Sequence, residues 1–281
     1  MVSNQRTIKE RVRFLGKGLQ TGRPVEMVCI PADIGNGVAF SRKDAPEGSR
    51  LRLKDDILKD GAKRRTTLGK GAFALQTVEH FLASLWALGI DNMEIEVKGP
   101  ELPVMDGSAL GFLSPLKEAG VIEQTELRRE IKIDRTISVE EGESSLEISP
   151  ADKLSVSYLI DYDVPCIERE NFEIELDADS FEKEIAPART FCLKREAFFL
   201  LFSGMGRGAN LNNTLVLGNR GPLWTEFRFP NEPVRHKVLD LVGDLYMMGV
   251  PVIGKVVAKK SGHSLNGRLV KRIYESYIKA V

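Results

Sequence analysis

The three histidines of the 281-residue chain, His80, His236 and His263, are the side chains best suited to metal or acid–base chemistry. His236, Asp240 and Asp244 are spaced four residues apart, so on a helix they form one polar stripe. Most other residues of this segment are apolar, whereas a surface helix normally confines its apolar residues to one face. The stripe is therefore expected to face a functional cleft, where a divalent cation would stabilise a neutral imidazole beside a carboxylate. A solvated His/Asp pair one turn apart would show the same spacing.

An internal repeat indicates how a second histidine could join this stripe. The tripeptide Pro-Ala-Asp at residues 31–33 recurs at residues 150–152, each time after an apolar run. A helical segment that ends at Gly89 and leads into an apolar run has a counterpart ending at Gly249. Each echo alone could be chance similarity, but their common order predicts two related halves. The wider spacing of the landmarks in the second half predicts an insertion there.

Aligning the two glycines places His80 opposite Asp240, so that paired helices would bring both to the same level as His236. Two imidazoles and one carboxylate would supply three ligands and leave a fourth position for water, as catalytic zinc sites require. Glu79 precedes His80 and points about 100° away from it on a helix, which suits a general base acting on that water. An acid in the first helical turn also stabilises the helix dipole, and Glu79 could have both roles.

The elements that must position these residues are those of an α+β protein. Alternating or short apolar runs predict strands at residues 25–30, 38–40, 93–97, 131–139, 146–148, 154–160, 215–217 and 252–257. Apolar residues recurring every three to four positions predict helices at residues 77–88, 109–119, 194–202, 234–248 and 269–280. We expect two similar domains, residues 1–124 and 125–281.

Composition and charge exclude several classes of protein. Forty Lys and Arg residues balance forty Asp and Glu residues, so no net charge favours binding to nucleic acid or to an anionic membrane. The longest apolar stretches fall far short of the ~20 residues that span a bilayer, and the polar N-terminus lacks the apolar core of a secretion signal. Cys29, Cys166 and Cys192 are odd in number and widely separated, which argues against a disulfide framework. We expect a cytoplasmic monomer without a transmembrane segment or a nucleic-acid partner.

Two further segments argue against phosphate-loop and covalent chemistry. The glycine-rich residues 16–22 match neither the dinucleotide-binding spacing nor the ending of a P-loop, so they predict a turn between strands. The segment Ser261–His263 does not form a nucleophile elbow, and no Ser or Cys has a recognisable base nearby in sequence. Covalent catalysis is therefore disfavoured.

Six segments carry a resemblance to a known family over nearly the whole chain. They are Thr77–His80, Gly89–Asn92, Glu101–Ala109, Ala186–Phe191, His236–Tyr246 and Lys260–His263. Together and in this order they resemble the UDP-3-O-acyl-N-acetylglucosamine deacetylase family of lipid A biosynthesis. The resemblance implies two similar domains, each a layered sheet-and-helix sandwich, with the active site between them. It also implies a UDP-linked acylated glucosamine as substrate and acetate as a product.

The resemblance implies a metal site and a base. Zinc would be bound by His80, His236 and Asp240, and Glu79 would be the general base that takes a proton from water. Ligands of these types also suit ferrous iron, so the metal is left open between the two.

The resemblance implies three further catalytic residues, His263, Asp244 and Thr190, and one substrate-binding residue, Lys237. The family's catalytic histidine matches His263, held by the acid at Asp244, and could donate a proton to the departing sugar amine. Thr190 matches a hydroxyl that hydrogen-bonds the reacting carbonyl, and Lys237 matches a group that contacts the substrate.

Substrate recognition is expected from two regions. The family uses its second insertion, expected here at about residues 192–215, as an apolar passage for the acyl chain, near Phe191, Phe198 and Phe202. An amphipathic helix that merely covers a sheet would show the same apolar stripe. Tyr162, beside Asp161, offers an aromatic face where the family stacks uracil.

Four positions depart from the family pattern and leave two alternatives open. Gln20 and Val164 stand where the family usually has histidine, Cys192 where it has glycine, and Ser144 where it often has a basic residue. These changes are compatible with a deacetylase of a different acyl-sugar. A member that has lost catalysis and only binds zinc or a sugar nucleotide is the other alternative, although such a protein need not keep Glu79 beside a ligand.

Overall fold

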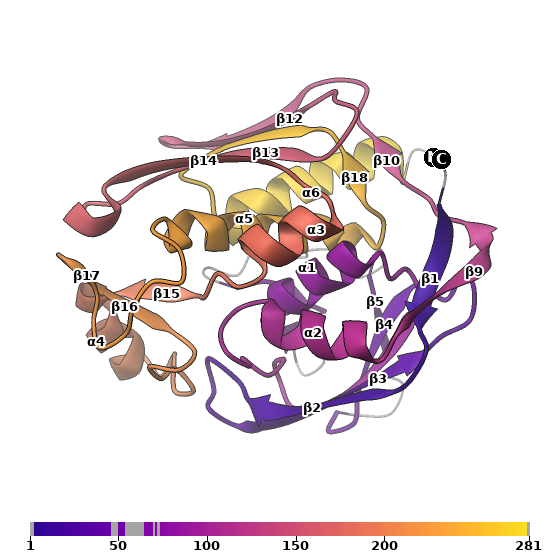
Figure 1. Ribbon diagram of the computed structural model, residues 1–281, viewed down its shortest axis with the longest axis horizontal. Coiled ribbons are helices and arrows are strands. Elements are labelled where there is room, and N and C mark those ends of the chain that lie inside the picture. The colour runs from indigo at the N-terminus through magenta and orange to yellow at the C-terminus, as the bar shows by residue number, and fades with distance from the viewer. Residues whose placement is uncertain (1–2, 46–49, 54–64, 70, 72–73, 280–281) are drawn as a thin grey trace.

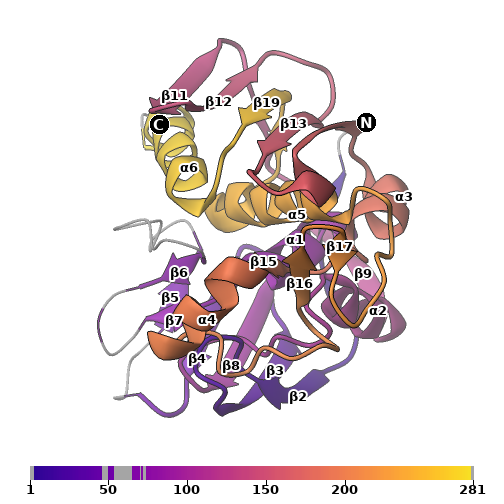
Figure 2. The same ribbon diagram turned by 90° about the vertical axis from the view of Figure 1, so that its left-hand side faces the viewer.

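Two five-stranded sheets enclose a double layer of helices (Figures 1 and 2). The computed structural model describes residues 3–45, 50–53, 65–69, 71 and 74–279. In spatial order the first sheet contains Val12–Lys17 (β2), Pro24–Pro31 (β3), Met93–Lys98 (β8), Val38–Arg42 (β4) and Arg50–Arg52 (β5). The second contains Ile137–Glu141 (β11), Ser144–Ser149 (β12), Lys255–Lys259 (β19), Ser155–Asp161 (β13) and Arg169–Glu175 (β14).

The two sheets have the same strand order and the same strand directions. In each sheet one inner pair is parallel, β4 with β8 and β13 with β19, and the other neighbours are antiparallel. Alternate side chains face the helices, so that Val156, Tyr158 and Ile160 of β13 are buried while the residues between them are partly exposed. The shared topology agrees with the internal repeat in the sequence.

Helices from both halves lie between the sheets. They are Glu79–Leu88 (α1), Leu110–Glu118 (α2), Glu232–Leu245 (α5), which continues as the 3₁₀ turn Tyr246–Met248 (η4), and His263–Tyr277 (α6). Gly89 and Gly249 end equivalent helices with φ of 66° and 70°, a left-handed conformation that glycine adopts without strain. Each helix then leads into a strand of its own half, as the repeat predicted.

The remaining elements are short strand pairs, connecting turns and the insertion. Asn4–Ile8 (β1) pairs with Val121–Leu127 (β9), Thr67–Leu68 (β6) with Leu75–Gln76 (β7), and Ile131–Lys132 (β10) with Val252–Ile253 (β18). Ala178–Ser180 (α3), the π-turn Phe181–Ile185 (η3) and the 3₁₀ turn Pro165–Ile167 (η2) connect larger elements. The insertion forms a small sheet of Phe191–Leu193 (β15), Leu215–Gly218 (β16) and Gly221–Pro222 (β17), with Lys194–Phe202 (α4) beside it.

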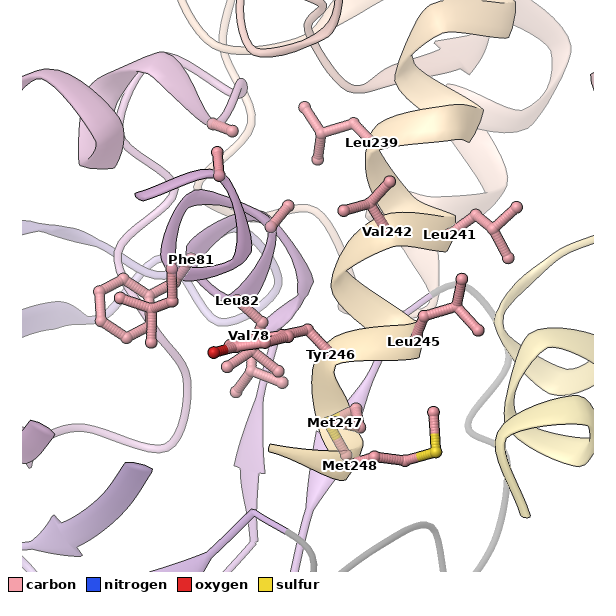
Figure 3. Close-up of a cluster of buried hydrophobic side chains, with 14 of the residues drawn as sticks. Val78, Phe81, Leu82, Leu239, Leu241, Val242, Leu245, Tyr246, Met247 and Met248 are labelled. Carbon is pink, nitrogen blue, oxygen red and sulfur yellow. The ribbon is translucent and has the colours of Figure 1, made fainter. Parts of the chain in front are cut away.

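The contact between α1 and α5 forms the centre of the molecule. Figure 3 shows Val242 of α5 and Tyr246 of η4 pointing toward α1, where Leu82 lies close by, whereas Leu241 points away. All four side chains are fully buried, and the Tyr246 hydroxyl donates a hydrogen bond of 2.6 Å to the carbonyl of Ile90. The packing of these buried side chains therefore fixes the position of the two helices relative to each other.

Gly243 permits the close approach of these helices. A Cβ atom at this position would lie 2.1 Å from the carbonyl oxygen of Glu79. We expect Gly243→Ala to lower the free energy of unfolding by about 1–3 kcal/mol, because the helices must move apart to admit a methyl group. Denaturant unfolding measures this change. Where no such contact exists, alanine stabilises a helix relative to glycine. An unchanged or higher stability of Gly243→Ala would therefore contradict the prediction.

The sequence-based predictions of class and of most elements are confirmed, with particular differences. The fold is α+β, and the glycine-rich residues 16–22 form the turn between β2 and β3. The run 131–139 is divided into β10 and β11, and the run 252–257 into β18 and β19 at Gly254. The last helix begins at His263, six residues before its expected start, and residue 280 of the expected helix lies outside the described residues. The expected domain boundary at residues 124–125 falls inside β9 and stays a prediction. In the described residues no helix is both long enough and apolar enough to cross a membrane.

Candidate active site

Helices α1 and α5 bring His80, His236 and Asp240 together between the two halves. One nitrogen or oxygen atom from each residue lies within 4.8 Å of the corresponding atoms of the others. Oδ1 of Asp240 is 3.6 Å from Nε2 of His80 and 3.4 Å from Nε2 of His236. All three side chains are buried. The spatial convergence expected from the repeat is therefore present.

The charge states of these groups fit a divalent cation. Nδ1 of His236 donates to the carbonyl oxygen of Ala188 at 3.0 Å, which leaves Nε2 as a free acceptor facing Asp240. Burial lowers the pKa of His236 to about 3, although Asp240 opposes this change, so the imidazole is neutral. Burial alone would raise the pKa of Asp240, but the charges of Lys237 and His263 hold it well below its usual value. A neutral imidazole and an ionised carboxylate are the forms that bind metal.

Glu79 and His263 form an acid–base pair beside this cluster. Nε2 of His263 is 3.9 Å from Oε1 of Glu79 and 3.7 Å from Oδ2 of Asp240, and its Nδ1 donates to Oδ2 of Asp244 at 2.9 Å. Burial raises the pKa of Glu79, although His263 and His80 oppose it. Burial disfavours the protonated form of His263, but the two aspartates overcome this and raise its pKa to about 9. The site thus combines a carboxylate with a cationic imidazole.

Three positions that the sequence analysis did not single out hold these groups in place. Nδ2 of Asn266 donates to Oδ2 of Asp244 at 2.8 Å, and the Thr66 hydroxyl donates to Oδ1 of the same carboxylate. Asn266 follows His263 by three residues on α6, so helical spacing could have identified it. Thr66 is 178 residues from Asp244 and the Ala188 carbonyl belongs to the backbone, so no local pattern indicates either of them.

A buried ion pair anchors the segment that carries Ala188 and Thr190. Nε of Arg189 and its backbone N–H both donate to Oε1 of Glu232, at 2.8 and 2.9 Å. Glu232 lies in the first turn of α5, four residues before His236, and its side chain is completely buried. The helix that supplies His236 therefore also fixes the carbonyl that orients its imidazole.

A cavity of about 320 Å³ opens onto these groups. Thr190, Phe191, Tyr162 and Lys237, all expected at the site, line it together with Glu79, His80, His236, Asp240 and His263. The rings of Tyr162 and Phe191 meet edge to face with centroids 5.8 Å apart, and Nζ of Lys237 lies 5.7 Å from the centre of the Phe191 ring. One wall of the cavity is therefore aromatic and carries a positive charge.

The four departures from the family pattern have different surroundings. Gln20 and Cys192 line the cavity, and Oε1 of Gln20 accepts a hydrogen bond from the backbone of Gly206 in the insertion. Val164 is buried in a small apolar cluster with residues of β15 and β16. The Ser144 hydroxyl donates to the carbonyl of Lys260. Only the first two can touch a ligand in the cavity directly.

Two of the expected substrate-binding residues, Asp161 and Phe202, do not line the cavity. The carboxylate of Asp161 pairs with Lys260 at 2.9 Å at the end of β13. The side chain of Phe202 is 96% exposed on α4. The side chain of Phe198 lies outside the described residues. On the insertion side the wall instead includes Cys192, Leu193, Glu196, Gly206 and Ala209.

Comparison with known proteins identifies the family of this chain. Residues 5–275 match the family described as UDP-3-O-acyl N-acetylglycosamine deacetylase, LpxC. The chain belongs to this family. Over 271 residues it is 38% identical to the UDP-3-O-acyl-N-acetylglucosamine deacetylase of Anaeromyxobacter sp. (strain Fw109-5), a match that covers 96% of this chain and 88% of the relative. The proteins of the same name from Anaeromyxobacter dehalogenans (strain 2CP-C) and Myxococcus xanthus (strain DK1622) are 39% and 37% identical, over 96% of this chain and 87% and 86% of their own.

Membership of the LpxC deacetylase family confirms the resemblance found in six short segments. The family is one of metalloenzymes, and the described residues contain two groups of three with the spacing of metal ligands. The groups are His80, His236 and Asp240, and Glu79, Asp240 and His263. They share Asp240 and both lie at the cavity.

Proposed function

We propose that the chain is a zinc-dependent hydrolase that removes the N-acetyl group from UDP-3-O-acyl-N-acetylglucosamine, an early step of lipid A biosynthesis. The observation that carries the proposal is a buried ligand set of two imidazoles and one carboxylate, beside which lie a buried glutamate and a His–Asp pair. The names of relatives that match nearly the whole chain support the choice of substrate. A cytoplasmic location and a monomeric state stay predictions.

The metal would be held by His80, His236 and Asp240. Their neutral and ionised forms, their mutual distances and their burial fit a divalent ion with three protein ligands. A bound zinc ion supplies a Lewis acid that polarises a carbonyl and acidifies a water molecule. His and carboxylate ligands also accept ferrous iron, and zinc is proposed by analogy with the family.

The chain's own residues would move the protons of the reaction. Glu79 takes a proton from the attacking water, and the raised pKa of its buried carboxyl makes it a stronger base than an exposed one. When the bond between carbon and nitrogen breaks, Nε2 of His263 gives a proton to the departing amine. Asp244 accepts a hydrogen bond from Nδ1 of His263, which fixes the ring and favours the protonated form needed for this step. Acetate and a free amino sugar nucleotide result.

Other cavity residues would position the substrate. The Thr190 hydroxyl is proposed to hydrogen-bond the reacting carbonyl, and Lys237 to contact the substrate near the metal. Tyr162 would stack on uracil, with Asp161 beside it at the end of β13. Phe191 contributes apolar surface for the acyl chain.

The insertion is proposed to form the passage for the acyl chain. Its cavity wall includes Cys192 and Leu193 from β15. Phe198 and Phe202 of α4 are proposed to contact the chain where it leaves the cavity, and the exposure of Phe202 limits it to the outer end of such a passage.

Acetate release from the proposed substrate tests the function. Metal-loaded protein incubated with UDP-3-O-acyl-N-acetylglucosamine should release one acetate per amine formed, detected by an enzyme-coupled assay and by mass spectrometry. The matched comparison is the same acyl-sugar without the nucleotide. It should react more slowly, because it has no uracil ring to stack on the aromatic wall of the cavity. Since Gln20 and Cys192 line the cavity in place of the family's residues, release from the second compound alone would favour a different acyl-sugar substrate. No release from either compound would contradict a deacetylase.

A further inference from the structure

We propose that Thr66 is a positioning residue, whose hydroxyl holds the Asp244–His263 pair in the orientation needed for proton donation. This inference rests on the proposed function, because the pair matters only if His263 acts on the substrate. Thr66 does not itself line the cavity and is 2% exposed, so it would act through other side chains.

The Asp244 carboxylate is held by hydrogen bonds on both of its oxygens. Oδ2 accepts from Nδ1 of His263 at 2.9 Å and from Nδ2 of Asn266 at 2.8 Å. Within the described part of the chain, the Thr66 hydroxyl is the group that donates to Oδ1. The same hydroxyl oxygen lies 3.1 Å from Nδ1 of His263. Removing the hydroxyl would leave one buried carboxylate oxygen without a donor among the described residues, and the carboxylate would be free to rotate away from His263.

The backbone of Thr66 is fixed to the segment that leads into α1. Its N–H donates to Oε2 of Glu79 at 3.2 Å, and its carbonyl accepts from the N–H of Thr77 at 2.9 Å. Thr77 has φ of 57°, a left-handed conformation that is strained for a β-branched residue. The turn between β7 and α1 thus holds Thr66 against Glu79, so that one residue contacts both the base and the partner of the acid.

A substitution that removes only the Thr66 hydroxyl tests its hydrogen bond to Asp244 separately from the backbone contacts of Thr66. Thr66→Val keeps the shape and the backbone N–H that donates to Glu79, but it removes the donor to Asp244. We expect kcat to fall by roughly 10–100-fold, as is typical when a group that orients a catalytic ligand is lost, while KM changes little because Thr66 does not reach the substrate. Thr66→Ser restores the oxygen and should recover most of kcat.

Thr67→Val is the matched control. Thr67 is the next residue, and its hydroxyl oxygen is buried with no hydrogen-bond partner among the described residues. This variant should retain the wild-type kcat. Equal kcat values for Thr66→Val and Thr67→Val would overturn the proposal. If Thr66→Val does not fold, Thr66→Ala and Thr67→Ala, which remove the same oxygens with less bulk, are compared in the same way.

Two further measurements separate positioning from general damage. In an Asp244→Asn background Thr66→Val should lower kcat little further, because both changes break one network; an undiminished second loss would contradict the proposal. NMR of the His263 ring needs no turnover, and the chain has three histidines to assign. The Nδ1–H signal should shift in Thr66→Val and not in Thr67→Val. If the wild-type protein releases no acetate, the proposed function fails while this shift still decides the role of Thr66.

Discussion

Glu79→Gln is expected to keep the metal and to lower kcat by about 10²–10⁴-fold, the contribution typical of a general base. Glutamine has nearly the same shape and can accept a hydrogen bond from Thr66, but it cannot take a proton from water. Since Glu79 is not in the proposed ligand set, metal content measured by elemental analysis should stay near that of the wild-type protein. Steady-state acetate release then gives kcat and KM separately.

A matched control for Glu79 is Glu196→Gln. Glu196 lines the same cavity from α4 and belongs to neither group of three metal-ligand residues. Its replacement should change kcat far less than that of Glu79. Wild-type activity in Glu79→Gln would refute the mechanism, and loss of the metal in that variant would move Glu79 into the ligand set.

His236→Ala is expected to lose the metal and the activity together. The substitution removes one of three proposed protein ligands. The two that remain, His80 and Asp240, lie on different helices. Two ligands bind a divalent ion far more weakly than three, so dialysed protein should contain little metal. Treating the wild-type protein with a chelator should abolish acetate release in the same way, and adding zinc back should restore it in the wild type alone.

The third histidine distinguishes the ligand role from the acid role. His263→Ala should also lose most activity, but it should keep the metal, because His263 lies outside the set formed by His80, His236 and Asp240. Equal metal content in His236→Ala and His263→Ala would contradict this ligand assignment. Loss of metal in His263→Ala alone would favour the other group, of Glu79, Asp240 and His263.

Much of the fold follows from periodicity and from the repeat. Long apolar patterns predicted α1 and α5 closely, because these helices are buried on most of their faces. The apolar pattern of α4 also predicted its bounds, although Phe199 and Phe202 are exposed. Two of the strands that were missed are polar: β1 reads Asn-Gln-Arg-Thr-Ile, and β14 alternates charged with apolar residues. Such strands owe their conformation to pairing with neighbours, which a single segment does not reveal.

The site was predictable where its residues share a helix and unpredictable where they meet across the fold. His236 and Asp240 are one turn apart, and the repeat brought His80 to them. The Thr66 hydroxyl reaches Asp244 because the β6–β7 hairpin holds Thr66 beside the start of α1. The Ala188 carbonyl belongs to the backbone, so no residue type in the sequence indicates its role. In the insertion the family resemblance implied a passage for the acyl chain, whereas the apolar helical stripe was equally compatible with a helix that covers a sheet. Periodicity alone did not indicate that Phe202 is exposed.

The common strand order of the two sheets has a consequence for metal binding. One sheet-and-helix layer supplies His80 and the other supplies His236 and Asp240, so neither layer alone holds a complete coordination sphere. An ion bound by the proposed ligand set would join the two layers. Ion binding and the docking of the layers would then be linked, so that each favours the other.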